Sequence, residues 1–208
     1  AITPAIEADA NQRKVDRLKR EKEVADGIAR AKENQIKQQA RKFLGTIAYD
    51  YMVNEEAYKE AEVIDVYEKI RADKEQYIGA LKESGVDNLL ALKFDEMIEA
   101  GTETFMQETL RPAKYTHTQG KLLTNFQDGV LDINNNFNLG LYKKEDGSLD
   151  PEAAMADIAE MYTTFHQDNN DFFNPSDNKV NAALDALVID MKDSQPFSII
   201  GQYMESTV

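Results

Sequence analysis

Apolar residues recur at helical spacing along most of the chain, and few stretches alternate between apolar and polar positions as β-strands do. Clear apolar stripes run through residues 58–81, 89–98 and 122–137. Each stripe is bounded by residues that cap or end helices. This pattern predicts an all-α protein, with a long N-terminal helical arm followed by a multi-helix body of antiparallel helices joined by short loops.

The first helix is predicted to run from Asp9 to Asp50, and its apolar residues are unevenly spaced. They are sparse at first and become dense only at Phe43, Leu44 and Ile47. Because a helix needs a broad apolar face to lie against a core, the first three quarters of this helix are too polar to be buried. We therefore divide the chain into a polar, basic helical arm (1–42) and a helical body (43–208).

Two helices are predicted in the first part of the body. Asn54 can cap a helix that ends at Gly85, and Asp87 can cap the next one. Gly101 is expected to interrupt or kink this second helix, and Pro112 is expected to stop it.

The second part of the body is predicted to begin with a loop over residues 112–120, "PAKYTHTQG". A helix then starts near Lys121, and its Asn-rich end at residues 132–138 is expected to fray. After an Asp-Gly turn, Asp150 and Pro151 can serve as the N-cap and first residue of another helix.

Two more helices complete the prediction. Residues 171–178, "DFFNPSDN", are expected to separate the preceding helix from one that carries Val180 to Met191. Gln195 and Pro196 are expected to end that helix, and a short last helix contains Ile199.

Charge is distributed unevenly along the chain. Residues 11–42 hold 11 Lys and Arg against 5 Asp and Glu, a balance of +6, whereas residues 43–208 hold 13 against 31, a balance of −18. An acidic body would be repelled by bare DNA unless the basic arm dominates locally.

No catalytic or metal-binding motif is found. The chain has no Cys, so thiolate nucleophiles and cysteine-ligated metals are excluded. No Ser lies in a G-x-S-x-G motif, and no glycine cluster resembles a phosphate-binding loop. We therefore predict no catalytic residues, no metal site and no cofactor, and a protein that is not an enzyme.

The sequence contains two weaker metal signals. The stretch "EDGSLD" places Gly147 as in a calcium loop, but that loop would need ligands at Tyr142 and Lys144 and a carboxylate at Ala153. An ordinary Asp-Gly turn followed by a helix cap is the preferred interpretation. His117 and His166 lie 49 residues apart, in a predicted loop and a predicted helix, and are read as separate exposed side chains.

The basic arm permits three kinds of partner. Clustered bases could neutralise DNA phosphates without sequence specificity, although the arm also carries acids and has no aromatic residue before Phe43. The residues that would contact nucleic acid are Arg13, Lys14, Arg17, Lys19 and Arg20. A membrane surface is disfavoured because the arm lacks a large apolar face.

The preferred partner is another helix. A heptad-like seam runs along the arm and is imperfect in its middle. Its apolar members are Val15, Leu18, Ala25, Ala29, Ile36 and Phe43. The arm is thus expected to pack on neighbouring copies or on other subunits.

The longest aliphatic run, Leu89 to Leu92, is far shorter than the roughly 20 apolar residues of a membrane-spanning helix, so no such segment is predicted. Ala1 is expected to follow a removed initiator Met. The apolar C-terminal residues suggest that the native chain extends beyond Val208 as a longer protein.

Several stretches resemble internal virion proteins of short-tailed phages (podoviruses), the core or ejection proteins that sit on the portal inside the capsid. The resemblance rests on the order and texture of the opening Gln- and Lys-rich helix and of three later segments. These are "ARKFLGTIAYDYM", "SGVDNLLALKFDEMIEAG" and "ALVIDMKDSQPFSIIGQYM".

That resemblance implies a structural protein that forms a homo-oligomer, as a ring, beside the portal and neighbouring core proteins. It implies location in the virion interior, then in the host cell envelope when the protein helps form a conduit for genome delivery. Two alternatives stay open from the residues alone. One is a cytoplasmic helical adaptor or coiled-coil scaffold, and the other is a DNA-associated protein that uses the basic arm.

Overall fold

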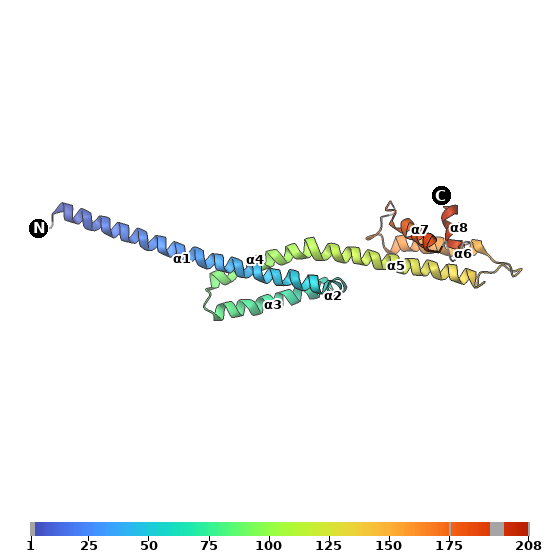
Figure 1. The fold of residues 1–208 in the computed structure, drawn as a ribbon, viewed down its shortest axis with the longest axis horizontal. Coiled ribbons are helices and arrows are strands. Elements are labelled where there is room, and N and C mark those ends of the chain that lie inside the picture. Colours follow the sequence, from blue (N-terminus) through green and yellow to red (C-terminus); the bar gives the residue numbers. More distant parts are fainter. Residues whose placement is uncertain (1–2, 175, 192–197, 208) are drawn as a thin grey trace. The chain divides into compact units, whose positions relative to one another are not determined.

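The computed structural model describes residues 3–174, 176–191 and 198–207, and these residues are almost entirely helical (Figure 1). Within them, extended pairing is limited to one isolated bridge, between Lys143 and Leu149. The predicted all-α fold with a long N-terminal helix is confirmed. The chain forms two compact units, Ala1–Pro112 and Ala113–Val208.

The first unit contains α1 (Pro4–Val53), α2 (Glu55–Glu60), α3 (Val63–Glu83), α4 (Asn88–Phe105) and the π-helical segment η1 (Met106–Leu110). Its core forms where α4 packs against both α1 and α3. Three rings mark the centre of this core. Tyr77 stacks on Phe94 with 5.0 Å between ring centroids, and Phe43 meets both rings edge-on.

The core of the first unit begins before the predicted boundary between arm and body at residues 42/43. Ile36 and Ala40, which precede that boundary, are buried in the same core as Phe43. The core of the first unit therefore begins at Ile36, about five turns before the end of α1, and the chain divides into its two compact units after Pro112.

The single helix predicted between Asn54 and Gly85 is wrong, because the chain bends after Glu60 to form α2 and α3. Tyr58 is buried, its ring meets Tyr51 edge-on, and its hydroxyl donates to Asp50 at 2.6 Å. These contacts hold α2 against the end of α1, so tertiary packing overrides the local preference for one long helix.

The predicted stop at Pro112 is also wrong, and Gly101 lies inside α4 without interrupting it. The helical backbone instead passes through η1 and continues as α5 (Arg111–Asn138). Proline removes one backbone donor and its ring crowds the carbonyl four residues earlier. The wider turn of a π-helix at Met106–Leu110 relieves that crowding where an α-helix would break.

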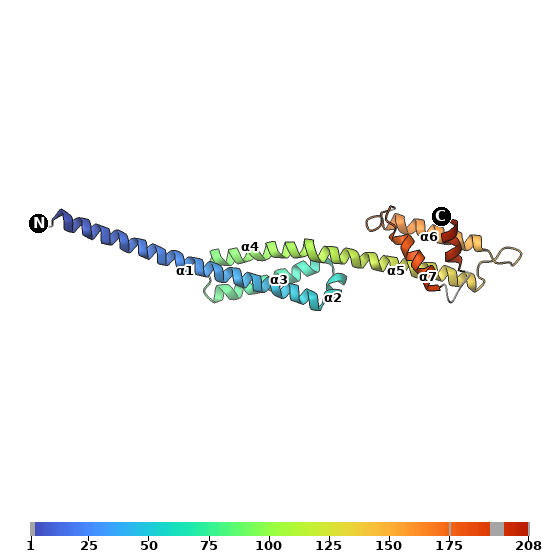
Figure 2. The same cartoon turned by 45° about the horizontal axis from the view of Figure 1, so that its top comes forward.

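The second unit contains α5 from Ala113 onward, α6 (Pro151–Asp168), α7 (Lys179–Met191) and α8 (Ile199–Ser206). Figures 1 and 2 show α6, α7 and α8 gathered beside the C-terminal part of α5. The core includes Phe126 and Val130 from α5, Ile158 from α6 and Leu184 from α7, all with less than a tenth of their surface exposed.

Two predictions for α5 are corrected. Residues 112–120 are helical, so His117 lies on a helix. The run 132–138 does not fray either, because Asn134 is fully buried and its Oδ1 accepts the backbone N–H of Ile199 at 3.0 Å. A polar side chain that looked exposed in the sequence is thus a tertiary link between α5 and α8.

Two predicted side-chain caps are confirmed, whereas Asn54 precedes α2 without a side-chain cap hydrogen bond. Asp87 accepts the N–H of Leu90 at 2.9 Å, and Asp150 accepts that of Ala153 at 3.1 Å. Gly147 has φ +83° in an exposed turn, which confirms the Asp-Gly turn and helix cap. The expected helix end at Gln195 and Pro196 lies outside the described residues.

Candidate interaction site

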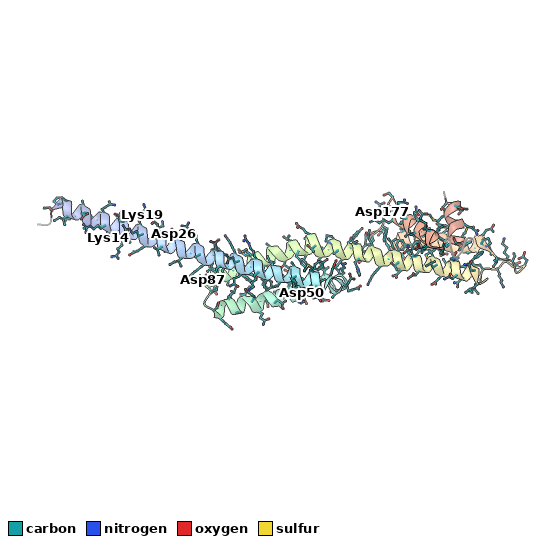
Figure 3. All side chains as sticks on the ribbon, viewed as in Figure 1. Lys14, Lys19, Asp26, Asp50, Asp87 and Asp177 are labelled. Carbon is teal, nitrogen blue, oxygen red and sulfur yellow. The ribbon has the colours of Figure 1, made fainter. Side chains whose placement is uncertain are left out.

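The N-terminal part of α1 is the most accessible element of the first unit. From Pro4 to Gln35 no side chain is buried, and Ile36 is the first that is. Figure 3 labels Lys14, Lys19 and Asp26 on this stretch. We call residues 4–35 the exposed arm. A rise of 1.5 Å per residue gives this stretch a length of about 48 Å.

The structure divides the predicted seam into two parts. Val15, Leu18, Ala25 and Ala29 are exposed on the arm, with 57% of Val15 and 53% of Leu18 accessible. Ile36 and Phe43 are buried in the core of the first unit. These last two residues are therefore already covered by their own unit.

The two parts are nevertheless one stripe. At about 100° per residue, the four exposed seam residues fall on the same side of α1, within a sector of about 80°, as its buried residues Ile36, Ala40, Phe43 and Ile47. A helical partner that followed this stripe toward the N-terminus would therefore continue the packing that α4 provides nearer the core.

The predicted basic residues are all exposed on the arm. Arg13 pairs with Asp9 at 2.7 Å and Arg17 with Glu21 at 3.0 Å, each across one helical turn. Pairs this exposed add little stability, so the bases remain available to an outside partner.

The arm joins the core at an ion cluster around Glu33. Its carboxylate lies 3.1 Å from the Lys37 ammonium and 3.5 Å from that of Lys93 on α4. The hydrogen bond and charge of Lys37, followed by the charge of Lys93, lower the pKa of Glu33. This cluster marks the end of the exposed arm.

A groove between α5 and α6, entirely within the second unit, was not predicted from the sequence. It has a volume of about 640 Å³. Its floor is apolar, and its lining includes three carboxylates. The apolar lining residues are Leu122, Phe126, Ile133, Met161 and Phe165, and the acidic ones are Asp157, Glu160 and Asp168.

No Lys or Arg among the described residues lines this α5–α6 groove. Burial, followed by the hydrogen bond that the Tyr142 hydroxyl donates to Asp157 at 2.6 Å, raises the pKa of Tyr142 to about 12. Gly129 gives the Met161 side chain room, since a Cβ there would lie 2.9 Å from Met161 Cε. The groove thus combines an apolar floor with negatively charged edges.

A second unpredicted cluster surrounds Lys74 on α3, which is 7% exposed. Its ammonium binds Asp95 at 2.7 Å and also Glu99, which accepts the Tyr67 hydroxyl. Burial opposes the charge, but the hydrogen bonds to Asp95 and Glu99 outweigh it and raise the pKa of Lys74. This compensated ion cluster ties α3 to α4.

Among the described residues, no group of three or more His, Asp or Glu is placed to hold a metal ion. His117 and His166 are half-buried and not exposed as predicted. His166 packs edge-on against Tyr162, and both its ring nitrogens are buried without a hydrogen-bond partner. No helix in the described ranges is both long and apolar enough to cross a bilayer.

No protein-family model matches the chain, and neither the search of curated proteins nor the search of solved structures finds a match.

Proposed function

We propose that this chain is a structural protein of the internal core or ejection apparatus of a short-tailed phage. In this role it assembles on the portal, beside neighbouring core proteins, and helps form a conduit for genome delivery. It would work in the virion interior and then in the host cell envelope, by assembly and without catalysis.

The observation that carries the proposal is the exposed arm. Its large apolar residues Val15, Leu18, Val24 and Ile28 are each more than half exposed. An isolated helix gains little stability from propensity alone, and most helices in proteins are stabilised by burying one face. An arm of this length is therefore best explained by a partner that covers it after assembly.

The acidic balance of residues 43–208 supports the conduit. A wall rich in carboxylates repels phosphates and lets DNA slide without sticking. The resemblance to internal virion proteins supplies the rest of the proposal, including the portal and the ring.

The test is to locate the protein in particles. Mass spectrometry and electron microscopy of purified virions are expected to find the chain as a symmetric ring on the portal. A stable monomer that is absent from every particle would contradict the proposal.

The exposed seam also favours a second candidate, a cytoplasmic helical adaptor or coiled-coil scaffold. Recovery of one stoichiometric cellular partner on the arm would support it.

The exposed bases favour a third candidate, a DNA-associated protein. Binding would be non-specific and steeply salt-dependent. It would be lost when the five predicted contact residues are replaced together, namely Arg13, Lys14, Arg17, Lys19 and Arg20.

A further inference from the structure

We propose that the exposed arm of one copy docks in the α5–α6 groove of a second copy, with Val15 and Leu18 as the apolar anchors. The inference rests on the proposed assembly function and names the surface on which the arm would be covered. Two features carry it: the match in charge and the match in apolar pattern.

The groove offers what an amphipathic helix needs. Phe126, Ile133 and Phe165 form an apolar floor and are each less than a tenth exposed. Glu160 and Asp168 are exposed on α6 and form no ion pair with any described residue. A helix that inserts apolar side chains while presenting cations to the edges would satisfy both the floor and the carboxylates.

The arm presents that pattern on one face. Val15 and Leu18 are three residues apart and so project from the same side of α1. Lys14 and Lys19 flank the line between them, each about 70° away around the helix axis. Both are exposed and lie on the stretch labelled in Figure 3.

The opposite face of the arm provides an internal control. Arg13 and Arg20 each project about 170° from the line midway between the two anchors, on the side of the helix that faces away from the groove. Both pairs carry the same charge and are exposed. The two pairs differ in their position around the helix, and Arg13 also forms an exposed ion pair with Asp9.

Charge complementarity selects a second copy over nucleic acid as the occupant of the groove. The carboxylates of Asp157, Glu160 and Asp168 would repel phosphates, whereas the arm segment 13–20 carries five bases and one acid. Because the groove and the arm are two different surfaces of the chain, the contact between copies is heterologous. Such contacts close into rings or extend into filaments, depending on the rotation between copies.

The first experiment measures self-association of the full chain by sedimentation and light scattering. Lys14→Glu with Lys19→Glu is expected to weaken association by roughly tenfold or more, because like charges then face each other across the contact. Arg13→Glu with Arg20→Glu should change it far less. Equal weakening by both pairs would indicate unspecific attraction and overturn the proposal.

The second experiment restores the contact with groove variants. Glu160→Lys with Asp168→Lys should weaken association alone and recover it when mixed with the Lys14→Glu, Lys19→Glu chain. Circular dichroism checks that each variant is folded. Assembly that persists unchanged in both double variants would sink this docking mode while leaving the proposed function intact, whereas a chain that never associates would contradict both.

The third experiment tests contact between copies directly, using the absence of native Cys. Thr164 on α6 also lines the groove, so a Leu18→Cys chain mixed with a Thr164→Cys chain should give a disulfide-linked heterodimer. Thr163→Cys, exposed on another side of α6, is the matched control. If a chain that carries both Leu18→Cys and Thr164→Cys cross-links only within itself, the arm folds onto its own body and the proposal is wrong.

Discussion

Asn134 connects α5 to the first residue of α8 from a fully buried position. The N–H of Ile199 belongs to the first turn of a helix, where backbone donors have no partner within the helix. The Asn134 side chain supplies that partner, so one amide both satisfies a helix end and fixes the approach of two elements.

We expect Asn134→Ala to lower the free energy of unfolding by about 1–3 kcal/mol, since it leaves a buried donor unpaired and removes packing. Urea unfolding followed by circular dichroism measures this. Asn135→Ala, at an exposed neighbouring position, is the control and should change stability by less than about 0.5 kcal/mol. Similar losses in both variants would argue against the link.

Asp50 is expected to make stability depend on pH. Its carboxylate accepts the Tyr58 hydroxyl at 2.6 Å and the Lys69 ammonium at 2.9 Å. These bonds, led by that from Tyr58, lower the pKa of Asp50 below its ordinary 3.8. Because the pKa is lower in the folded state, ionised Asp50 stabilises the fold above about pH 4, and this stabilisation is lost as the pH falls through the folded value.

Tyr58→Phe removes the leading cause of that shift. At pH 7 the variant should be less stable than the parent chain, and the difference should shrink as the pH is lowered below about 4. The effect should be modest, because 37% of the Asp50 side chain is exposed. Urea unfolding at pH 7 and pH 3 measures it, and a difference independent of pH would show that the hydrogen bond is not responsible.

At the scale of elements, Gly101 lies where α4 packs closely against α1. A Cβ at this position would lie 2.4 Å from Cδ1 and 2.6 Å from Cδ2 of Leu44. The glycine therefore has a packing role within a helix that would otherwise favour alanine.

Gly101→Ala is expected to destabilise the first unit by about 1–3 kcal/mol, because overpacking at Leu44 outweighs the gain in helix propensity. Gly79→Ala on α3 is the matched control, since nothing lies within 4 Å of its Cβ. That variant should be more stable by about 0.5–1 kcal/mol. Thermal unfolding of the two variants should thus shift in opposite directions, and equal shifts would contradict the packing role.

The helices could be predicted to the extent that their signals are local. Asp87, Asp150 and Gly147 act through neighbouring backbone groups, and their roles follow from a few consecutive residues. The bend after Glu60 and the helix through Pro112 could not be predicted. They depend on Tyr58 packing against α1 and on a π-helical turn, neither of which has a local sequence signal.

At the scale of the whole molecule, the arm should be the most protease-sensitive segment of the free protein. Residues 11–36 carry few large apolar side chains and bury none before Ile36. Limited trypsin digestion of the free chain should cut after Lys14, Arg17, Lys19 or Arg20, while the residues from about Phe43 onward resist. Assembly should protect the arm, and equal protection in both states would mean that the arm folds back on its own body.

Of the candidate site, the exposed arm could be predicted from the sequence and the α5–α6 groove could not. The exposure of Val15, Leu18 and the basic residues follows from their sparse, polar surroundings on one continuous helix. The α5–α6 groove could not be predicted, because its lining side chains come from two helices and meet only when these helices pack. The lining residues fall between positions Leu122 and Asn169 of the sequence. The spacing of Asp157, Glu160 and Asp168 along α6 is a weak signal, because acids are abundant throughout the body.

The length of α1 also sets a distance. Leu18 precedes Ile36, the first buried residue, by 18 positions, or about 27 Å along the helix axis. A copy held at Leu18 would therefore be anchored well outside the packed part of the first unit, as if by a rigid spacer. An assembly built in this way would be an open framework with solvent-filled gaps. Each residue added between Leu18 and Ile36 would lengthen the spacer by about 1.5 Å and rotate the anchors by about 100° around the helix axis.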